Sequence, residues 1–201
     1  MMLGARTAAW SGKALPYDAE IEFLESTGTQ YIGLGFMQDK LYRAEMDVSI
    51  PVSGKKGSYV ICGANQTTSI GSYLSAYSAS TKFIQMFVTG SPNTRIPAND
   101  SRTKITIDTV AGMLSGYGIT AIFGEINVSP YANFVIFASR KETRSQAGTR
   151  FYSFKYESDF NSVNLIPVRK GNIGYMYDRV SGQLFGNSGT GAFIIGPDKT
   201  T

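Results

Sequence analysis

The clearest pattern in the chain is the strict alternation of apolar and polar residues over Arg43–Ile50. Alanine, methionine, valine and isoleucine occupy the even positions, and arginine, glutamate, aspartate and serine occupy the odd ones. A period of two places successive side chains on opposite faces of a β-strand. The segment is therefore predicted to be a strand with one buried face and one solvent face. Glu20–Phe23 and Lys104–Asp108 repeat the pattern.

A further alternating run, Phe151–Glu157, predicts a strand on which Tyr152, Phe154 and Tyr156 share one face. Four other runs are apolar on both faces of the expected strand, which favours central strands covered on both sides. They are Ser58–Cys62, Phe83–Val88, Ile119–Phe123 and Phe134–Ala138.

The C-terminal part is predicted to form a hairpin. Ile173–Asp178 and Gln183–Phe185 would be its strands, and Arg179–Gly182 its turn. Gly182 can supply the positive φ that such a turn needs. No window shows a helical period longer than a turn or two. Many short strands separated by turn residues indicate an antiparallel β-sandwich or jelly roll.

Composition supports an all-β domain. The 201 residues include 22 glycines, 12 tyrosines and 12 phenylalanines, the residues of turns and pleated faces. Hydrophobic residues make up 42% and charged residues 17%, enough apolar content for a folded core. Cys62 lies in an apolar run and is predicted to be a small buried hydrophobe without a disulfide.

Residues 1–17 differ from the rest. They show no strand alternation and no acidic residue, and they contain the chain's single tryptophan, Trp10, with Arg6 and Lys13. We expect an extended N-terminal attachment arm over 1–17 and a sandwich domain over 18–201. Arg6, Trp10 and Lys13 are the candidate partner contacts, because tryptophan is a favoured hot-spot residue. The alternative is that Trp10 folds back onto the domain.

The net charge of +4 is mild and spread along the chain. The densest basic cluster (Arg140, Lys141, Arg144 and Arg150) is interrupted by Glu142 and is interpreted as a solvated loop, so no nucleic-acid binding is expected. No apolar stretch approaches the ~20 residues of a membrane span, and no membrane contact is expected. The opening residues lack a secretory apolar region, which predicts synthesis in the cytosol.

The residue inventory argues against catalysis. The chain has no histidine and one cysteine, which removes Ser-His-Asp systems and thiolate zinc clusters. Jelly-roll glucanases carry the strand pattern E-x-D-x-x-E, and this chain reads Glu45-Met-Asp47-Val-Ser-Ile50. One of the two working carboxylates is replaced by Ile50. We expect a protein that is not an enzyme, with Glu45 and Asp47 on a solvent face.

Exposed aromatic side chains could stack on sugars. The candidates lie in or beside expected loops and are Tyr73, Tyr77, Tyr117 and Tyr131. Tyrosine is also ordinary at sandwich edges, so a structural role is the alternative.

No cofactor is expected, with Ca²⁺ as the one exception to consider, since Asp and Asn oxygens are its usual ligands. The candidate calcium ligands are Asn93, Asn99 and Asp100 in one loop, and Asp178 near Asn187.

Longer stretches resemble a known family. They are Met2–Trp10, Tyr17–Ile32, Arg150–Lys155, Leu165–Arg169 and Gly174–Asn187. Together they are similar to the laminin-G-like, concanavalin A-like jelly-roll proteins of gut Bacteroidales and their tailed phages, crAss-like phages among them. The sandwich stretches bracket about residues 17–197. The resemblance implies a jelly-roll fold and carries no catalytic motif; the segment Tyr156–Asn161 departs from the family in local loop shape.

The N-terminal stretch resembles attachment arms in front of variable domains on phage particles. This implies a virion structural protein of the capsid-decoration or head-fibre type, assembled in the host cytoplasm and released by lysis. Its partners would be other virion proteins and further copies of itself, as a dimer or trimer. The alternative is a glycan- or receptor-binding module of a phage tail or bacterial surface, with host or mucus glycans as ligands.

Overall fold

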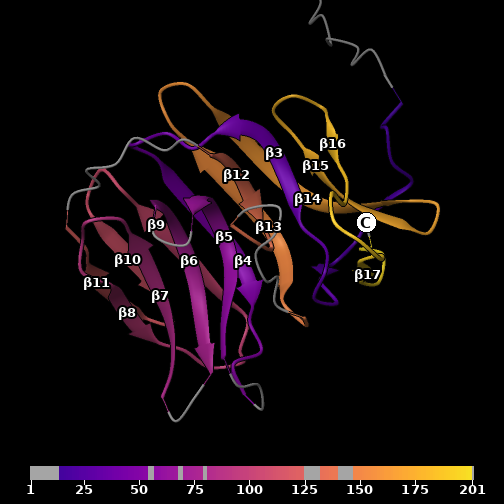
Figure 1. Ribbon diagram of the computed structural model, residues 1–201. Coiled ribbons are helices and arrows are strands. Elements are labelled where there is room, and N and C mark those ends of the chain that lie inside the picture. The colour runs from indigo at the N-terminus through magenta and orange to yellow at the C-terminus, as the bar shows by residue number, and fades with distance from the viewer. Residues whose placement is uncertain are drawn as a thin grey trace, which may run out of the picture.

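The computed structural model describes residues 14–53, 57–67, 70–78, 81–124, 132–139 and 147–200. The strands in these ranges form two antiparallel sheets that pack face to face (Figure 1). No helix long and apolar enough to cross a membrane occurs in the described ranges. The predicted all-β jelly-roll sandwich is confirmed.

The larger sheet has eleven strands. Its main path runs β11 (Ile119–Ile122), β10 (Met113–Gly116), β9 (Thr103–Asp108), β4 (Arg43–Ser49), β13 (Arg150–Glu157), β14 (Ser162–Lys170), β15 (Ile173–Asp178) and β16 (Leu184–Phe185). Three short strands pair beside this path: β1 (Ala19–Glu20), β2 (Leu24–Glu25) and β17 (Ile194–Ile195).

The smaller sheet has six strands. Their order is β3 (Ile32–Met37), β12 (Asn133–Ile136), β5 (Gly57–Thr67), β6 (Ile70–Ser78), β7 (Lys82–Val88) and β8 (Thr94–Pro97).

A cluster of aromatic rings joins the two sheets. Phe134 of the smaller sheet packs against Tyr156 and Phe154 of the larger one, at ring-centroid distances of 5.1 and 5.7 Å. Tyr42, which precedes β4, stacks on Tyr156 at 5.0 Å. All four side chains are fully buried or nearly so. Each buried ring contributes roughly 2–3 kcal/mol through apolar burial, so this cluster fixes how the sheets face one another.

The predicted faces of β13 are correct except at Tyr152. Phe154 and Tyr156 face the core, but the register against β4 shifts between Phe151 and Ser153. Such a bulge sets two residues against one, and Tyr152 turns to the outer face with Ser153. There Tyr152 contacts Phe23, at a ring-centroid distance of 5.8 Å.

The expectation that Ile119–Phe123 is a covered central strand is wrong. β11 is the edge of the larger sheet, and Ile122 is 70% exposed. The hydrophobic run is instead divided: Phe123 is buried in the core and donates its backbone N–H to the Gly112 carbonyl.

The C-terminal hairpin is confirmed, and its turn occurs twice. Asp178-Arg-Val-Ser-Gly182 begins at the last residue of β15, and Asp108-Thr-Val-Ala-Gly112 begins at the last residue of β9. In each turn the aspartate carboxylate accepts the backbone N–H groups two and three residues on. Each closing glycine has positive φ, 74° at Gly182 and 65° at Gly112. Side chains other than glycine rarely adopt this conformation, so both glycines are required by the turn.

Candidate functional site

The outer faces of the two sheets differ in charge. The strands of the larger sheet contain thirteen charged residues. The six strands of the smaller sheet contain two, Lys82 and Arg95. One face of the sandwich is therefore strongly hydrated and the other is not.

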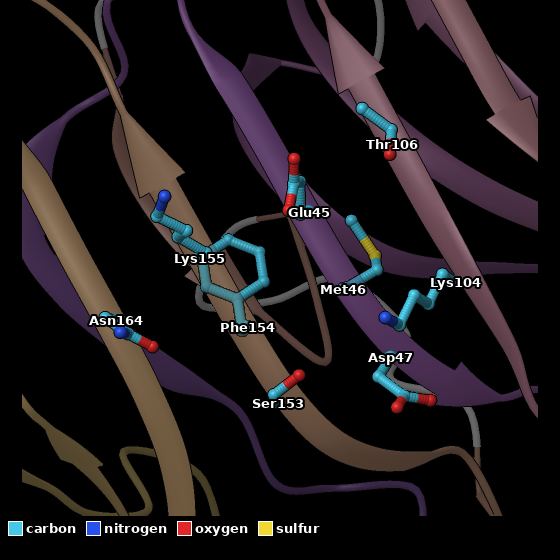
Figure 2. A pocket seen from close by; sticks show the side chains of 9 residues that line it. All are labelled: Glu45, Met46, Asp47, Lys104, Thr106, Ser153, Phe154, Lys155 and Asn164. Atoms are coloured by element: carbon cyan, nitrogen blue, oxygen red, sulfur yellow. The ribbon is translucent and has the colours of Figure 1, made fainter.

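A groove of about 360 Å³ crosses the outer face of the larger sheet. Its lining residues come from β9, β4, β13 and β14 (Figure 2) and are Lys104, Thr106, Glu45, Met46, Asp47, Ser153, Phe154, Lys155 and Asn164. Met46 and Phe154 belong to its floor, since both are buried in the core. The other seven side chains are charged or carry hydroxyl or amide groups, and this volume falls in the range of small-ligand sites.

Strand register sets these polar groups in two cross-strand rows. One row is Lys104, Asp47 and Ser153, and the other is Thr106, Glu45, Lys155 and Asn164. The outward position of Glu45 and Asp47 confirms that they occupy the solvent face of an amphipathic strand. Within the rows, Lys104 lies directly across from Asp47, and Lys155 from Glu45. Opposite charges in such positions commonly form cross-strand ion pairs, which would cover the groove.

One of the two opposed pairs, Glu45 and Lys155, binds along its own strands instead. Glu45 lies across from Lys155, yet its Oε1 binds Arg43 Nη2 at 2.7 Å. Lys155 Nζ binds Glu157 Oε1 at 2.9 Å. Both pairs join residues two apart on one strand, and they draw the charged groups toward one end of the groove. The middle of the groove therefore stays open.

Asp47 is held by Arg102. The guanidinium donates to both carboxylate oxygens, with Nε–Oδ1 and Nη2–Oδ2 distances of 2.8 Å. The hydrogen bond to Asp47 raises the pKa of Arg102. The same guanidinium lies 3.8 Å from the centroid of the Tyr152 ring, so the bulge in β13 helps to position it. Lys104, directly across from Asp47, forms no ion pair with a described carboxylate.

The glucanase-like pattern does not assemble on one surface. Ile50 is fully buried, on the opposite side of β4 from the groove. Glu45 and Asp47 are each bound to a guanidinium. The arrangement supplies hydrogen-bond donors and acceptors at fixed positions; that the protein is not an enzyme stays a prediction.

Tyr73 and Tyr77, two of the predicted sugar-stacking residues, lie together on the outer face of the smaller sheet. Tyr73 stacks on Phe87 and Tyr77 on Phe83, both at 4.7 Å, with interplanar angles of 23° and 22°. Arg95 lies 4.5 Å from the centroid of Phe83. We refer to these five side chains as the aromatic face. Each tyrosine presents one ring face to its phenylalanine partner.

The other two predicted tyrosines lie elsewhere. Tyr117 is in the β10–β11 turn, with φ of 53°, and its buried hydroxyl has no hydrogen-bond partner among the described residues. Desolvation raises the pKa of Tyr117 to about 12. Tyr131 lies outside the described residues, as do Arg6, Trp10 and Lys13. Of the arm, residues 14–17 are described, and Tyr17 packs on Tyr177 at a ring-centroid distance of 4.9 Å.

Four of the five candidate calcium ligands are used as turn caps, and the fifth, Asn93, is an exposed loop residue. Asp100 Oδ1 accepts the backbone N–H groups of Val52 and Ser53 at 2.7 and 2.8 Å. Asn99 Oδ1 accepts from Ser101, and Asn187 Oδ1 from Gly189.

Asp178 has the same role in a buried setting. Burial opposes its ionisation, but hydrogen bonds from Ser181 and the Asn164 backbone outweigh it and lower the pKa of the carboxyl. Within the described ranges, no group of three or more His, Cys, Asp or Glu residues could hold a metal ion.

Comparison with known proteins defines the fold. No family model and no curated protein matches the chain. Among solved structures it is similar to a native heptameric SAP-like pentraxin from Limulus polyphemus, with a TM-score of 0.53 and 13% sequence identity. The match covers 90% of this chain and 96% of the pentraxin chain. The chain therefore has the same jelly-roll sandwich fold as that pentraxin.

Proposed function

We propose that this chain is a non-catalytic binding module whose groove on the larger sheet holds a glycan. The carrying observation is that Glu45 and Lys155, placed across from each other, bind Arg43 and Glu157 instead. This leaves an open groove with polar groups at fixed positions. Sugar hydroxyls both donate and accept hydrogen bonds, and the hydroxyl and amide groups of the groove complement them.

The neutral groups would make the direct contacts. Thr106 and Ser153 carry hydroxyls, and Asn164 carries an amide that offers both two donors and an acceptor. The side chain of Asn164 projects from β14 at the end of its row, as Figure 2 shows. We assign it the role of fixing the orientation of one sugar ring.

We propose further that a phage particle displays this module, as a capsid decoration or head fibre. The support is the resemblance of Met2–Trp10 and of the sandwich stretches to phage-associated jelly-roll proteins. In this arrangement residues 1–17 contact other virion proteins through Arg6, Trp10 and Lys13, and the groove faces outward. The alternative is that the same groove belongs to a glycan- or receptor-binding module of a phage tail or bacterial surface.

Self-association as a dimer or trimer is part of the proposal. The aromatic face favours it, because an apolar surface with one guanidinium can meet a second copy without opposing dense like charges. The pentraxin of the same fold is heptameric.

A glycan array tests the binding function. The full chain should bind a subset of glycans, and Asn164→Ala should lower that binding about tenfold through loss of the amide contacts. Asn172→Ala, in an exposed turn outside the groove, is the matched control and should bind as the unchanged chain does. Absence of binding to every glycan on the array would overturn the glycan proposal.

Deleting residues 1–13 and measuring incorporation into particles tests the arm; undiminished incorporation would overturn its attachment role.

A further inference from the structure

We propose that the glycan in the groove is acidic and that one of its carboxylates binds the ammonium of Lys104. The inference rests on the proposed function and names the ligand class for the same groove. Lys104 lines the groove from β9 and is exposed. Its place in the charge pattern of the sheet makes it the group that an incoming anion would meet.

Lys104 has no ion-pair partner among the described carboxylates, because the aspartate across from it binds an arginine. Lys104 and Asp47 are directly opposed across β9 and β4. Both oxygens of Asp47 are taken by Arg102, and no described carboxylate forms an ion pair with Lys104. The second lysine of the groove differs, because Lys155 is bound to Glu157. The groove thus contains one lysine, Lys104, that forms no ion pair with a carboxylate of the described residues.

The flanking groups select the kind of anion. Glu45 and Asp47 are already paired with Arg43 and Arg102, and Lys155 with Glu157, so Lys104 is the one lysine of the groove that a ligand anion meets without an ion pair to a described carboxylate. A ligand with closely spaced negative charges would leave most of those charges unmatched in the groove. A nucleic acid or a densely sulfated chain would bring such charges. A polymer with isolated carboxylates among many hydroxyls, such as a uronic-acid or sialic-acid glycan, places one charge at Lys104 and hydroxyls along the rest of the groove.

The dimensions suit an oligosaccharide. Lys104 and Asn164 lie on β9 and β14, three strand spacings apart, which is about 14 Å. A ligand that reaches from the ammonium to the amide is longer than one sugar ring. We therefore expect a carboxylate near Lys104 and a neutral sugar ring near Asn164 of the same chain.

The test is calorimetric titration of the full chain with three probes: an oligosaccharide of neutral rings that ends in one sialic acid, the same oligosaccharide without the sialic acid, and single-stranded oligothymidylate. We expect the sialylated oligosaccharide to bind most tightly. Lys104→Gln should weaken it about tenfold, as loss of a charge-assisted hydrogen bond does, and should weaken binding of the neutral oligosaccharide by much less. Lys104→Arg should restore most of the affinity. Lys170→Gln removes an exposed lysine outside the groove and should have no effect.

The outcomes separate this inference from the proposed function. Binding of neutral and acidic probes that Asn164→Ala weakens and Lys104→Gln does not would overturn the acidic-ligand inference and leave the glycan groove standing. Tighter binding of oligothymidylate than of the sialylated oligosaccharide would overturn the inference in favour of a nucleic acid. Absence of binding to any carbohydrate, here and on the array, would overturn both.

Discussion

Arg102 and Asp47 form a two-point ion pair on the outer face of the larger sheet, although 55 positions separate them in the chain. Because Asp47 binds Arg102, it does not pair with Lys104, the lysine directly across from it. Without Arg102, the nearest cation across from Asp47 is Lys104, and a cross-strand pair between them would place both side chains over the groove. Arg102 thus keeps the groove open by binding Asp47.

The first prediction concerns Arg102→Met. We expect glycan affinity to fall about tenfold, because Asp47 is then free to pair with Lys104. The free energy of unfolding should change by less than about 1 kcal/mol, since the pair is partly exposed. Arg179→Met removes another exposed ion pair, with Glu20, and should leave affinity unchanged. Titration calorimetry and urea unfolding measure both quantities; unaltered affinity in Arg102→Met would contradict this role.

The second prediction concerns the ring cluster between the sheets. Phe134→Ala should lower the free energy of unfolding by about 3–5 kcal/mol, because a cavity opens where Phe134 meets Tyr156. Phe160 is 84% exposed, and Phe160→Ala should change the free energy by no more than about 0.5 kcal/mol. Urea unfolding monitored by tyrosine fluorescence compares the two variants. Equal losses would mean that the sheets are held together elsewhere.

The third prediction concerns pH and Asp178. The pKa of this carboxyl is lower in the folded chain than in the unfolded chain, so its contribution to stability is present above the unfolded pKa. That contribution is lost as the pH falls through the lower, folded pKa. Asp178→Asn should therefore destabilise the protein at neutral pH by about 1–3 kcal/mol and by much less near pH 2. Thermal melts from about pH 7 down to about pH 2 test this; a gap between the two proteins that stays constant with pH would contradict it.

The fourth prediction concerns the aromatic face. The double variant Tyr73→Ser, Tyr77→Ser should shift the sedimentation coefficient toward the monomer while the far-ultraviolet circular dichroism stays that of a β-protein. The same variant also tests the predicted sugar-stacking role of these tyrosines: loss of array binding with no change in sedimentation would favour a glycan role and contradict self-association through this face.

The sequence pattern was sufficient for strands whose faces are set locally. In β4 successive side chains face the core and the solvent in turn, and the alternation of apolar and polar residues in the sequence predicts this directly. Tyr152 was misplaced because the bulge in β13 arises from pairing with β4, which is distant in the chain. β11 was misjudged for a similar reason, since an apolar run does not reveal whether a strand ends at a sheet edge.

The groove could be predicted only in part. The solvent face of β4 was evident, so Glu45 and Asp47 were correctly placed. Lys104 was not identified, because its lack of an ion pair depends on Arg102, just before β9, binding Asp47 on the neighbouring strand β4. The pairing of Tyr73 with Phe87 likewise depends on the register of β6 against β7. Local patterns do not carry register, and both features follow from it.

The contrast between the two outer faces determines what a dimer could do. Copies that meet through their aromatic faces would stack four sheets, with the two larger sheets outermost and about 30 Å apart, at ~10 Å per layer. Their grooves would then point in opposite directions. Such a dimer could not engage one flat surface twice, but it could bridge two glycan chains. It would act as a cross-linker, and its multivalency would appear as network formation between polymers rather than as tighter attachment to a single one.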